Sequence, residues 1–397
     1  MNRPIPAVPM PLGWRDAFVA TKAGPAARSR FEEACRAYHG AQRAFAVSSG
    51  RAALWLVLRA LRGHSPDRSK VVLPAYTCPT VGRAVLAAGL SGVCVDIDAG
   101  HFNLRVEQVA EALDQETLAV VAPHMFGTPC EVAELTLLCA RQGVVLIEDL
   151  AQAFGARHSG QRVGTFGDLA FVSLGRSKNL RGFRGGVLLV NRPHLVSAVE
   201  QEAASLAAPS SVNWLAVGKQ LAISLLSTPI AWNIAKRLPA LRIGAEDQDF
   251  DPRPTRLGPW EAELGMRALA RVDECNSRRT HLARLMEIEL SSLAEVHVQT
   301  EPVGAESVHV RLATRLDTTS TRRDAIVSYL QARGIDARAF YTRPIYGYDW
   351  WPKAPSQEAC PEAERLVATN MILPLHYGMN DDQATWIAKS LGEALRT

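Results

Sequence analysis

The sequence predicts an α/β protein, with a three-layer αβα large domain around a mainly parallel sheet of about seven strands and a smaller α+β C-terminal domain. Two observations lead to this fold class. The chain has 397 residues, of which 47% are hydrophobic, so it can bury a large core and is long enough for two domains. Apolar, β-branched runs alternate with helical stretches through its first half, which is the pattern of parallel strands joined by crossover helices.

Seven apolar runs are the predicted strands of this sheet: Arg43–Val47, Lys70–Leu73, Gly92–Ile97, Leu118–Ala122, Gly143–Ile147, Leu169–Val172 and Val187–Val190. The helices expected around them occupy residues 14–42, 49–61, 79–89, 105–113 and 130–142. Ligands of parallel sheets bind beyond the carboxyl ends of the strands. We therefore expect the turn after Val47 and the carboxylate of Asp149 to lie at the same edge of the sheet.

Residues 196–250 interrupt the alternation and are predicted to form a helical insertion in the large domain. Within them, residues 214–241 are apolar, but Pro229 falls in the middle of their uncharged stretch, which argues against a transmembrane helix. We favour a helical pair packed on the body of the protein or on a partner subunit. Peripheral contact with a membrane is the alternative.

A proline-rich linker at Asp249–Pro259 leads into the second domain. We expect the large α/β domain in residues 1–250 and the small domain in residues 251–397. The small domain is predicted to contain a helix at 260–293, a strand at Val308–Thr314, and helices at 320–333 and 381–396.

Composition excludes several classes of protein. The net charge is +4 and the basic residues are scattered, so nucleic acid is not an expected partner. The seven cysteines show no metal-ligand spacing, so no metal is expected, and reduced thiols in a cytoplasmic protein fit best. The N-terminal residues are broken by prolines and lack the apolar run of a signal peptide.

Lys178 lies in a Gly-punctuated loop between two of the predicted strands. A lone lysine in a loop is usually exposed, so a solvated side chain is the alternative to a chemical role. Asp149 favours the chemical role, because it places a carboxylate at the end of an apolar strand upstream of this loop. A lysine that can hold an aldehyde and a carboxylate that can pair with a pyridine nitrogen are the parts of a pyridoxal 5′-phosphate (PLP) site.

A strand, a small-residue turn at Ser48–Gly50 and an apolar helix follow one another near the N-terminus. The start of such a helix offers free backbone N–H groups and the positive end of the helix dipole, which suit a phosphate. An ordinary helix cap is the alternative, since Ser and Gly are also common capping residues.

Several motifs in a fixed order resemble the DegT family of fold-type-I PLP enzymes, which are mostly sugar aminotransferases. The motifs are Ser49-Gly-Arg-Ala-Ala-Leu54, Leu73-Pro-Ala-Tyr-Thr77, Val95-Asp-Ile-Asp98, His124-Met-Phe-Gly127, Ile147-Glu-Asp-Leu-Ala-Gln-Ala153, Gly164-Thr-Phe-Gly-Asp168, Ser173 with Lys178-Asn-Leu180, and Leu373-Pro-Leu-His376. The resemblance runs from about residue 30 to the end, apart from residues 196–250. It implies a homodimer whose active sites lie at the subunit interface.

The resemblance also implies residue roles. Lys178 matches the family's Schiff-base lysine, which also moves the proton between substrate and cofactor. Asp149 matches the carboxylate on the pyridine nitrogen, and Gln152 the residue near the phenolic oxygen. Ser173 matches a phosphate-binding hydroxyl. The phosphate turn corresponds to Ser49, Gly50 and Arg51.

The chain departs from the family pattern at the phosphate turn and around the ring. Arg51 replaces the usual Thr, although a guanidinium can also bind phosphate. Cys78 replaces the aromatic residue expected over the ring, so either Tyr76 takes that place or stacking is weak. In this family, the partner subunit usually contacts the phosphate through a short motif, and this chain keeps only Arg256 of it.

The segment after the lysine carries further departures, because Arg181, Phe183 and Arg184 replace the usual small residues and glutamate. We hypothesise an added anion site made by Arg176, Arg181 and Arg184, since clustered guanidiniums recognise phosphate or carboxylate. The alternative is that these arginines face solvent or the partner subunit.

His124 and Tyr341 are further candidates for substrate binding. His124 follows an apolar strand and so falls at the carboxyl edge of the sheet, although a buried structural imidazole is the more frequent case. Tyr341 begins an aromatic stretch that extends to Trp351, and packing is at least as common a role for such rings.

These features together predict a PLP-dependent aminotransferase. It would move an amino group from an amino acid, with glutamate the expected donor, to a keto group of a nucleotide-linked sugar in cell-surface polysaccharide or secondary-metabolite biosynthesis. One alternative is a PLP-dependent keto-sugar dehydratase, but the family's dehydratases replace the lysine that this chain keeps. The other is a scaffold or regulator without turnover.

Overall fold

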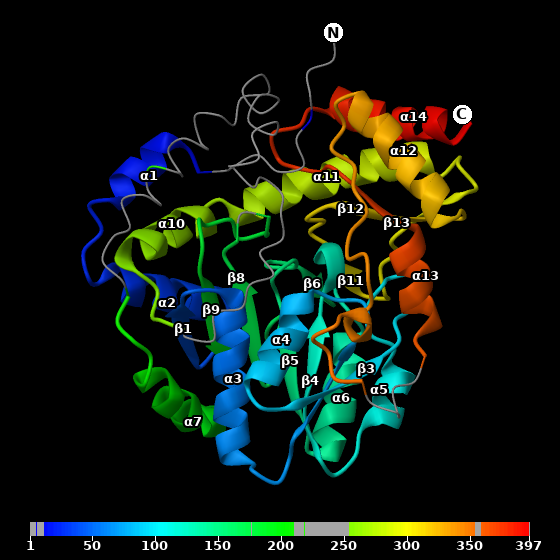
Figure 1. The fold of residues 1–397 in the computed structure, drawn as a ribbon. Coiled ribbons are helices and arrows are strands. Elements are labelled where there is room, and N and C mark those ends of the chain that lie inside the picture. Colours follow the sequence, from blue (N-terminus) through cyan, green and yellow to red (C-terminus); the bar gives the residue numbers. More distant parts are fainter. Residues whose placement is uncertain are drawn as a thin grey trace.

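The computed structural model describes residues 5, 12–175, 177–209, 218, 254–353 and 359–396. Its centre is a seven-stranded sheet of order β1-β9-β8-β5-β4-β2-β3 (Figure 1). The strands are β1 (Arg43–Val47), β2 (Lys70–Pro74), β3 (Ser91–Val95), β4 (Thr117–Pro123), β5 (Val145–Asp149), β8 (Leu169–Ser173) and β9 (Gly186–Val190). Among these strands, β9 alone runs antiparallel to both of its neighbours. The predicted fold class is confirmed.

Helices cover both faces of the sheet and make it the middle of three layers. One face packs against α3 (Gly50–His64), α4 (Pro79–Ala87) and α7 (Pro193–Ala204). The other packs against α2 (Ala27–His39), α5 (Val106–Ala112), α6 (Val132–Gln142) and α10 (Pro259–Leu269). Because both faces are covered, a central strand has no exposed polar face, and all seven residues of β4 are buried.

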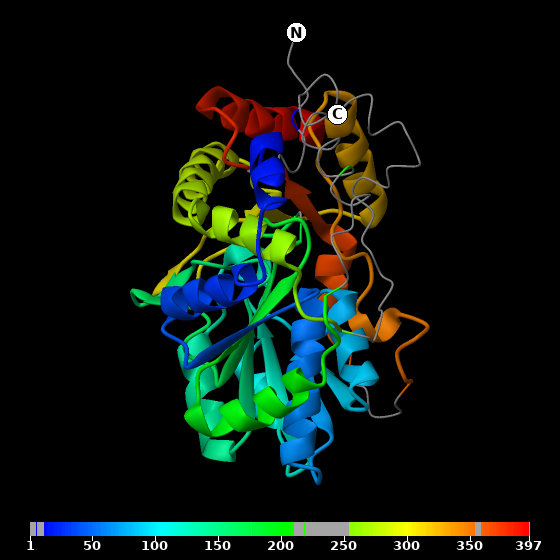
Figure 2. The ribbon, with the colours of Figure 1, turned by 90° about the vertical axis from the view of Figure 1, so that its left-hand side faces the viewer.

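The second unit is a small antiparallel sheet with helices on one side. It contains β10 (Val296–Val298), β12 (Leu312–Leu316) and β13 (Asn370–Leu373), together with α11 (Val272–Leu290), α12 (Ser320–Ala332) and α14 (Asp381–Arg396). The helix α13 (Pro361–Thr369) leads into β13. Figure 2 shows this unit stacked over one end of the large sheet.

Two elements of the second half differ from their predictions. The expected helix at 260–293 is two helices, because α10 ends at Leu269 and α11 begins only at Val272. The expected strand at Val308–Thr314 begins only at Leu312. Residues 308 and 310 instead donate backbone hydrogen bonds to Gly127 and Phe126 of the large domain, and His309 between them has a φ of 43°. A contact between the two units therefore replaces the start of the strand.

The first half of the chain also holds a break. The helical stretch expected at residues 14–42 is α1 (Trp14–Ala20) followed by α2, with a turn between them. The three-stranded sheet β11-β6-β7 was not predicted; it joins Ala305–Glu306 of the second unit to a hairpin formed by Arg157–His158 and Gln161–Arg162.

The apolar core suggests where the two domains divide. Leu257, Trp260 and Leu264 belong to the core of the large sheet, whereas Leu282 and Met286 belong to the core of the second unit. We propose that the large domain extends through α10 and that the boundary lies within α11, beyond the division at residue 250 expected from the linker.

The predicted insertion lies mostly outside the described residues. The part that is described includes α7 and the segment to residue 209. The apolar stretch 214–241 falls outside, apart from Gly218. Among the described residues, no helix combines the length and the hydropathy needed to cross a bilayer.

Candidate active site

Asp149 ends β5 and is buried at the carboxyl edge of the large sheet. One of its carboxylate oxygens, Oδ1, accepts a hydrogen bond from the backbone N–H of Ala151 at 2.8 Å. Burial raises the pKa of this carboxyl group, although the Ala151 N–H and the charges of Lys178 and His124 act in the opposite direction. A cationic ligand group would therefore stabilise the carboxylate.

Glu148, its neighbour in β5, points to the other face of the strand, as alternate side chains do. Its two oxygens accept backbone hydrogen bonds from Gly164, Phe166 and Gly167 at 2.6 to 2.9 Å. The imidazole Nε2 of His124 lies 3.1 Å from the same carboxylate. Glu148 therefore anchors the loop after the hairpin beneath the site.

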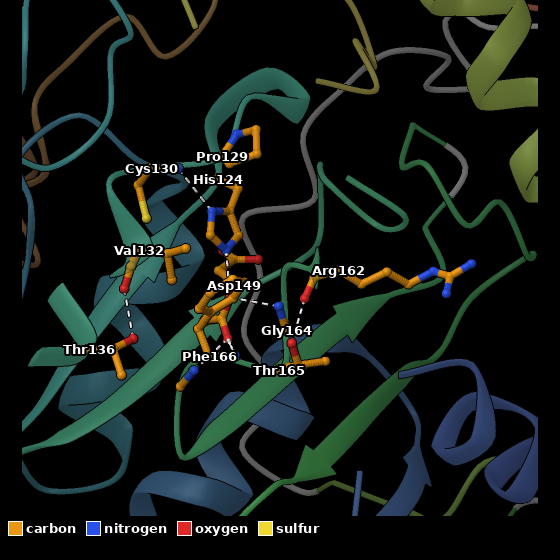
Figure 3. A network of polar contacts seen from close by, with 12 residues as sticks. His124, Pro129, Cys130, Val132, Thr136, Asp149, Arg162, Gly164, Thr165 and Phe166 are labelled. Atoms are coloured by element: carbon orange, nitrogen blue, oxygen red, sulfur yellow. Dashed lines mark hydrogen bonds and ion pairs between the residues drawn. The ribbon is translucent and has the colours of Figure 1, made fainter. Parts of the chain in front are cut away.

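His124 has both ring nitrogens engaged. Its Nδ1 accepts a hydrogen bond from the backbone N–H of Cys130 at 3.1 Å, so the proton is on Nε2, which donates to Glu148. Figure 3 shows the ring between Cys130 and the strand end at Asp149, with Gly164 and Phe166 beyond. The side chain is fully buried, which favours the structural alternative over contact with a substrate.

The predicted phosphate turn is the N-terminus of α3. Ser49 caps the helix by accepting a hydrogen bond from the N–H of Ala52. The backbone here packs against Ser173, since a Cβ on Gly50 would lie 2.8 Å from the Cβ of Ser173. A Cβ on Gly186 would lie 2.4 Å from the backbone of Ser49. Neither position has room for a side chain, and Arg51 is half-buried in the first helical turn.

Lys178 lies beside this turn. Its backbone N–H bonds to the carbonyl of Gly175. A Cβ on Gly175 would lie 3.3 Å from the Cγ of Lys178 and 3.5 Å from the Oγ of Ser173. Since Lys178 also acts electrostatically on Asp149, the structure brings Lys178, Asp149, Ser173 and the start of α3 to one place.

Gln152 and two tyrosines close the side of the site toward the second unit. Gln152 donates from Nε2 to the hydroxyl of Tyr341 at 3.3 Å. Its Oε1 is buried and has no hydrogen-bond partner among the described residues. Tyr76 is fully buried, with its hydroxyl 3.0 Å from the carbonyl of Phe340 and its ring 5.5 Å from that of Tyr341.

Arg256 and Arg184 lie together near Ser48. Arg256 forms a β-bridge with Val47 and donates to the carbonyl of Ala204 at 3.4 Å. Arg184 forms a 3.0 Å ion pair with Glu261, and its side chain is 48% exposed. Arg176, the remaining neighbour in the hypothesised anion site, lies outside the described residues.

Arg181 is buried, and the structure places it near two other buried arginines, Arg279 and Arg311. The sequence analysis did not predict that these two arginines lie near the lysine loop. Arg279 shares a face of α11 with the apolar Leu282, Ala283 and Met286. A charged residue on an otherwise apolar helical stripe is the signal that could have revealed it.

A separate surface cavity of about 390 Å³ holds none of the predicted site residues. It lies between the end of α2 and the β6–β7 hairpin and is lined by polar side chains, among them Arg157, Arg162 and Arg192. Two of these arginines pair with Asp273 and Asp168. We therefore assign the candidate active site to the edge of the sheet around Lys178.

The fold defines a class of protein. A mainly parallel seven-stranded sheet between helices, with a small C-terminal α+β unit over the carboxyl ends of the strands, is the type I fold of PLP-dependent transferases. Within it, the buried oxygen of Gln152, the buried carboxylate of Asp149 and the tight glycine cradle at Gly50 fit the groups of that cofactor.

The chain belongs to the DegT/DnrJ/EryC1/StrS aminotransferase family, whose model matches residues 18–213 and 253–392. It is 26% identical to the GDP-perosamine synthase of Escherichia coli O157:H7 over 92% of this chain and 89% of that protein. It is 28% identical to the dTDP-3-amino-3,4,6-trideoxy-alpha-D-glucose transaminase of Streptomyces venezuelae, over 91% and 86% of the two chains. The structure of DesV from S. venezuelae is 27% identical and superposes with a TM-score of 0.76, covering 96% and 94%. The resemblance noted in the sequence and the expectation of an aminotransferase are confirmed.

Proposed function

We propose that this protein is a PLP-dependent aminotransferase that transfers an amino group from an amino acid to a keto group of a nucleotide-linked sugar. One observation carries the chemistry: Lys178, the buried Asp149 and the N-terminus of α3 with Ser173 meet at the carboxyl edge of the sheet. These are groups for an aldehyde, a pyridine nitrogen and a phosphate in one site.

A different group of the protein would bind each part of the cofactor. The carboxylate of Asp149 would pair with the ring nitrogen through a charge-assisted hydrogen bond. The Oε1 of Gln152, buried and without a partner among the described residues, would accept a hydrogen bond from the phenolic O–H group. The N–H groups at the start of α3 and the hydroxyl of Ser173 would hold the phosphate.

When bound, PLP supplies an electron sink for the bonds of the substrate carbon that carries nitrogen. The chain supplies the proton transfer. The Nζ of Lys178 would hold the cofactor. Once released, it would move a proton between that carbon and the C4′ atom of the cofactor. Asp149 would keep the ring nitrogen protonated throughout.

The relatives support the substrate class. The chain is similar, over about nine tenths of its length, to two enzymes whose names include a GDP-linked and a dTDP-linked amino sugar. We infer a keto-sugar acceptor linked to a nucleotide, and an amino acid, with glutamate expected, as donor. We also infer a homodimer with shared sites. The seven cysteines are all free thiols, which supports our proposal of a cytoplasmic location.

The absorption spectrum of the purified protein with PLP tests this function. We expect a long-wavelength band from cofactor bound to a lysine, and we expect glutamate to convert it to the shorter-wavelength band of the aminated cofactor. Lys178→Ala should bind PLP without the long-wavelength band, because the amine that holds the aldehyde is gone.

Two results would count against the proposal. The same long-wavelength band in Lys178→Ala would show that another amine holds the cofactor. A wild-type band that no amino donor changes would exclude amino transfer and favour a protein without turnover. Lys22→Ala, a substitution in the turn after α1 away from the site, is the control and should behave as wild type.

A further inference from the structure

The surface cavity between the end of α2 and the β6–β7 hairpin is lined by three arginines. Its volume of about 390 Å³ lies within the range of sites that bind small molecules. Arg157 comes from β6, Arg162 from β7, and Arg192 from the residue that precedes α7. Three segments of the chain therefore bring guanidinium groups to one space.

Two of these arginines have N–H groups that their neighbours leave unused. Arg157 donates from Nη1 to the carbonyl of Gly160 at 2.6 Å, and no carboxylate of the described residues pairs with it. Arg162 has its Nη2 3.8 Å from a carboxylate oxygen of Asp273. The Nε of Arg162 is buried and has no hydrogen-bond partner in the part of the chain that the structure describes.

Arg192 is held by the loop after the hairpin. Its Nε donates to Asp168 at 3.0 Å, and its Nη2 donates to the carbonyl of Phe166 at 3.1 Å. Within the described ranges, Asp168 and Asp273 are the carboxylates that pair with the arginines of the cavity. Three guanidiniums therefore face two carboxylates, which leaves the cavity with a positive charge.

His39 adds a buried acceptor to the lining, with only 6% of the residue exposed. Its Nδ1 lies 3.4 Å from the carbonyl of Cys35, and because a carbonyl can only accept, Nδ1 carries the proton. Burial lowers the pKa of the imidazole to about 4, so the ring is neutral at pH 7. Its Nε2 is an acceptor that has no partner among the described residues. A ligand hydroxyl is the kind of donor that this nitrogen lacks.

The aromatic ring in the lining is already packed against its neighbours. The ring of Tyr38 stacks on that of Phe154, with centroids 4.9 Å apart and 15° between the planes. The guanidinium of Arg162 lies 4.1 Å from the centroid of the same ring. A nucleobase binds by stacking on a free ring face, so the lining suits a ligand with hydroxyl groups better than a nucleotide.

The cavity lies away from the proposed cofactor site. Asn191, in its lining, follows the last residue of β9, whereas Gly186, the first residue of β9, packs on the phosphate turn. The length of this strand corresponds to about 13 Å. Figure 3 shows the side chain of Arg162 extending away from the strand end at Asp149. A ligand in the cavity would therefore not be part of the cofactor site.

We propose that this cavity binds a small phosphorylated sugar, with the phosphate on Arg157, Arg162 and Arg192 and a hydroxyl group on His39. A phosphate monoester presents three oxygens in different directions, whereas the two oxygens of a carboxylate lie in one plane. Guanidiniums from three segments therefore suit the phosphate better. The proposal goes beyond the proposed function and does not depend on it, because neither the cofactor nor amino transfer takes part in this binding.

Calorimetric titration of the PLP-loaded protein with glucose 6-phosphate and with glucose 1-phosphate, at low ionic strength, tests the site. Loading with PLP fills the phosphate site of the cofactor. We expect Arg157→Gln to weaken the binding of the sugar phosphate by about tenfold or more, and Arg157→Lys to weaken it less. Inorganic phosphate should bind more weakly than the sugar phosphate, and glucose should not bind.

Arg68→Gln is the matched control and should bind as wild type. Arg68 is also half-buried and donates to backbone carbonyls, those of Thr117 and Gly143, but it lies outside the cavity. Circular dichroism shows whether each variant is folded. Arg157→Glu, which reverses the charge at the same position, should abolish binding and gives a second test of the same contact.

Binding of neither sugar phosphate would overturn the proposal. So would equal affinity in wild type, Arg157→Gln and Arg157→Glu, since it would place the ligand elsewhere. Inorganic phosphate that binds as tightly as the sugar phosphates would also overturn it, because no ligand hydroxyl would then take part. Arginine-dependent binding of a sugar phosphate in a protein that shows no amino transfer would reject the proposed function and support this site.

Discussion

Two adjacent carboxylates at the end of β5 have different surroundings. Asp149 lies on the face that meets Lys178, with a single hydrogen bond from a described residue. Glu148 lies on the opposite face, where Gly164, Phe166, Gly167 and His124 all donate to it. The alternation of a β-strand separates a residue suited to a ligand from one that holds the structure together.

Glu148→Gln should therefore destabilise the protein. All four partners of Glu148 are donors, and the amide of glutamine would direct N–H groups at some of them. Leaving buried donors without acceptors costs about 2–4 kcal/mol. Urea unfolding followed by circular dichroism measures the effect.

The exposed Glu111→Gln, on α5, is the control and should change stability by less than about 0.5 kcal/mol. If Glu148→Gln is as stable as this control, the hydrogen-bond network of Glu148 does not stabilise the fold.

At the scale of elements, the start of α3 illustrates what the sequence could predict. The apolar run of β1 and the Ser-Gly turn are local patterns, so the strand Arg43–Val47 and the helix after it were predicted correctly. The tight packing of this turn on Gly186 joins residues far apart in the chain, and no local pattern reveals it.

Gly186→Ala should displace the proposed phosphate turn. The new Cβ would lie 2.4 Å from the backbone carbon and oxygen of Ser49, and backbone atoms cannot turn aside as a flexible side chain can. We expect PLP affinity to fall by about tenfold or more, with a loss of about 1–3 kcal/mol in stability. A titration with PLP, followed by absorbance, measures the affinity.

Gly63→Ala in α3 is the control, because nothing lies within 4 Å of its Cβ position. It should stabilise the protein by about 0.5–1 kcal/mol and leave PLP binding unchanged. Unchanged PLP affinity in Gly186→Ala would mean that this turn does not bind the phosphate.

The docking of α1 gives a prediction with a pH dependence. Asp16 on α1 accepts hydrogen bonds from Arg271 and Arg267 at 3.0 to 3.2 Å. Burial would raise the pKa of Asp16, but the bonds from Arg271, the Gly13 N–H and Arg267 outweigh it, so the pKa is lowered. Because it is lowered by folding, the stabilisation is present above pH about 4 and is lost as the pH falls through the lowered value.

Asp16→Asn should therefore destabilise the protein at pH 7 by about 1–2 kcal/mol, since both arginines are partly exposed and solvent screens the pair. The difference from wild type in thermal unfolding should shrink below pH about 4. Asp67→Asn, at an exposed position, is the control. A difference that persists unchanged at low pH would show that the charge of Asp16 is not its cause.

For the whole molecule, the sequence predicts the fold better than the site. Strand positions follow from buried apolar runs such as β4, whose residues are buried without exception. The residues that surround Arg181 come from α11 and from the segment before β12, and only the packing of the two units brings them together. The strand β13 likewise depends on its pairing with β12, which no local pattern of the chain reveals.

The proposed dimer gives the last prediction, which concerns Arg256. The sequence resemblance implies that this residue reaches the phosphate of the partner's site, whereas within one chain it lies next to Val47 at the start of the phosphate turn. Mixing chains that carry Lys178→Ala with chains that carry Arg256→Ala can distinguish whether Arg256 acts on the partner's site or within its own chain. If Arg256 acts across the interface, each mixed dimer has one site in which both native residues are present.

Lys178→Ala should be inactive alone, and Arg256→Ala should be weakened at limiting PLP. After exchange of equal amounts, about half of the dimers are mixed and half of their sites are restored, so we expect about a quarter of wild-type activity at limiting PLP. Sedimentation of the same samples measures the fraction of dimer. Activity no greater than the sum of the two variants would mean that Arg256 supports the turn of its own chain, because a residue acting within its own chain cannot rescue the site that contains its neighbour's lysine.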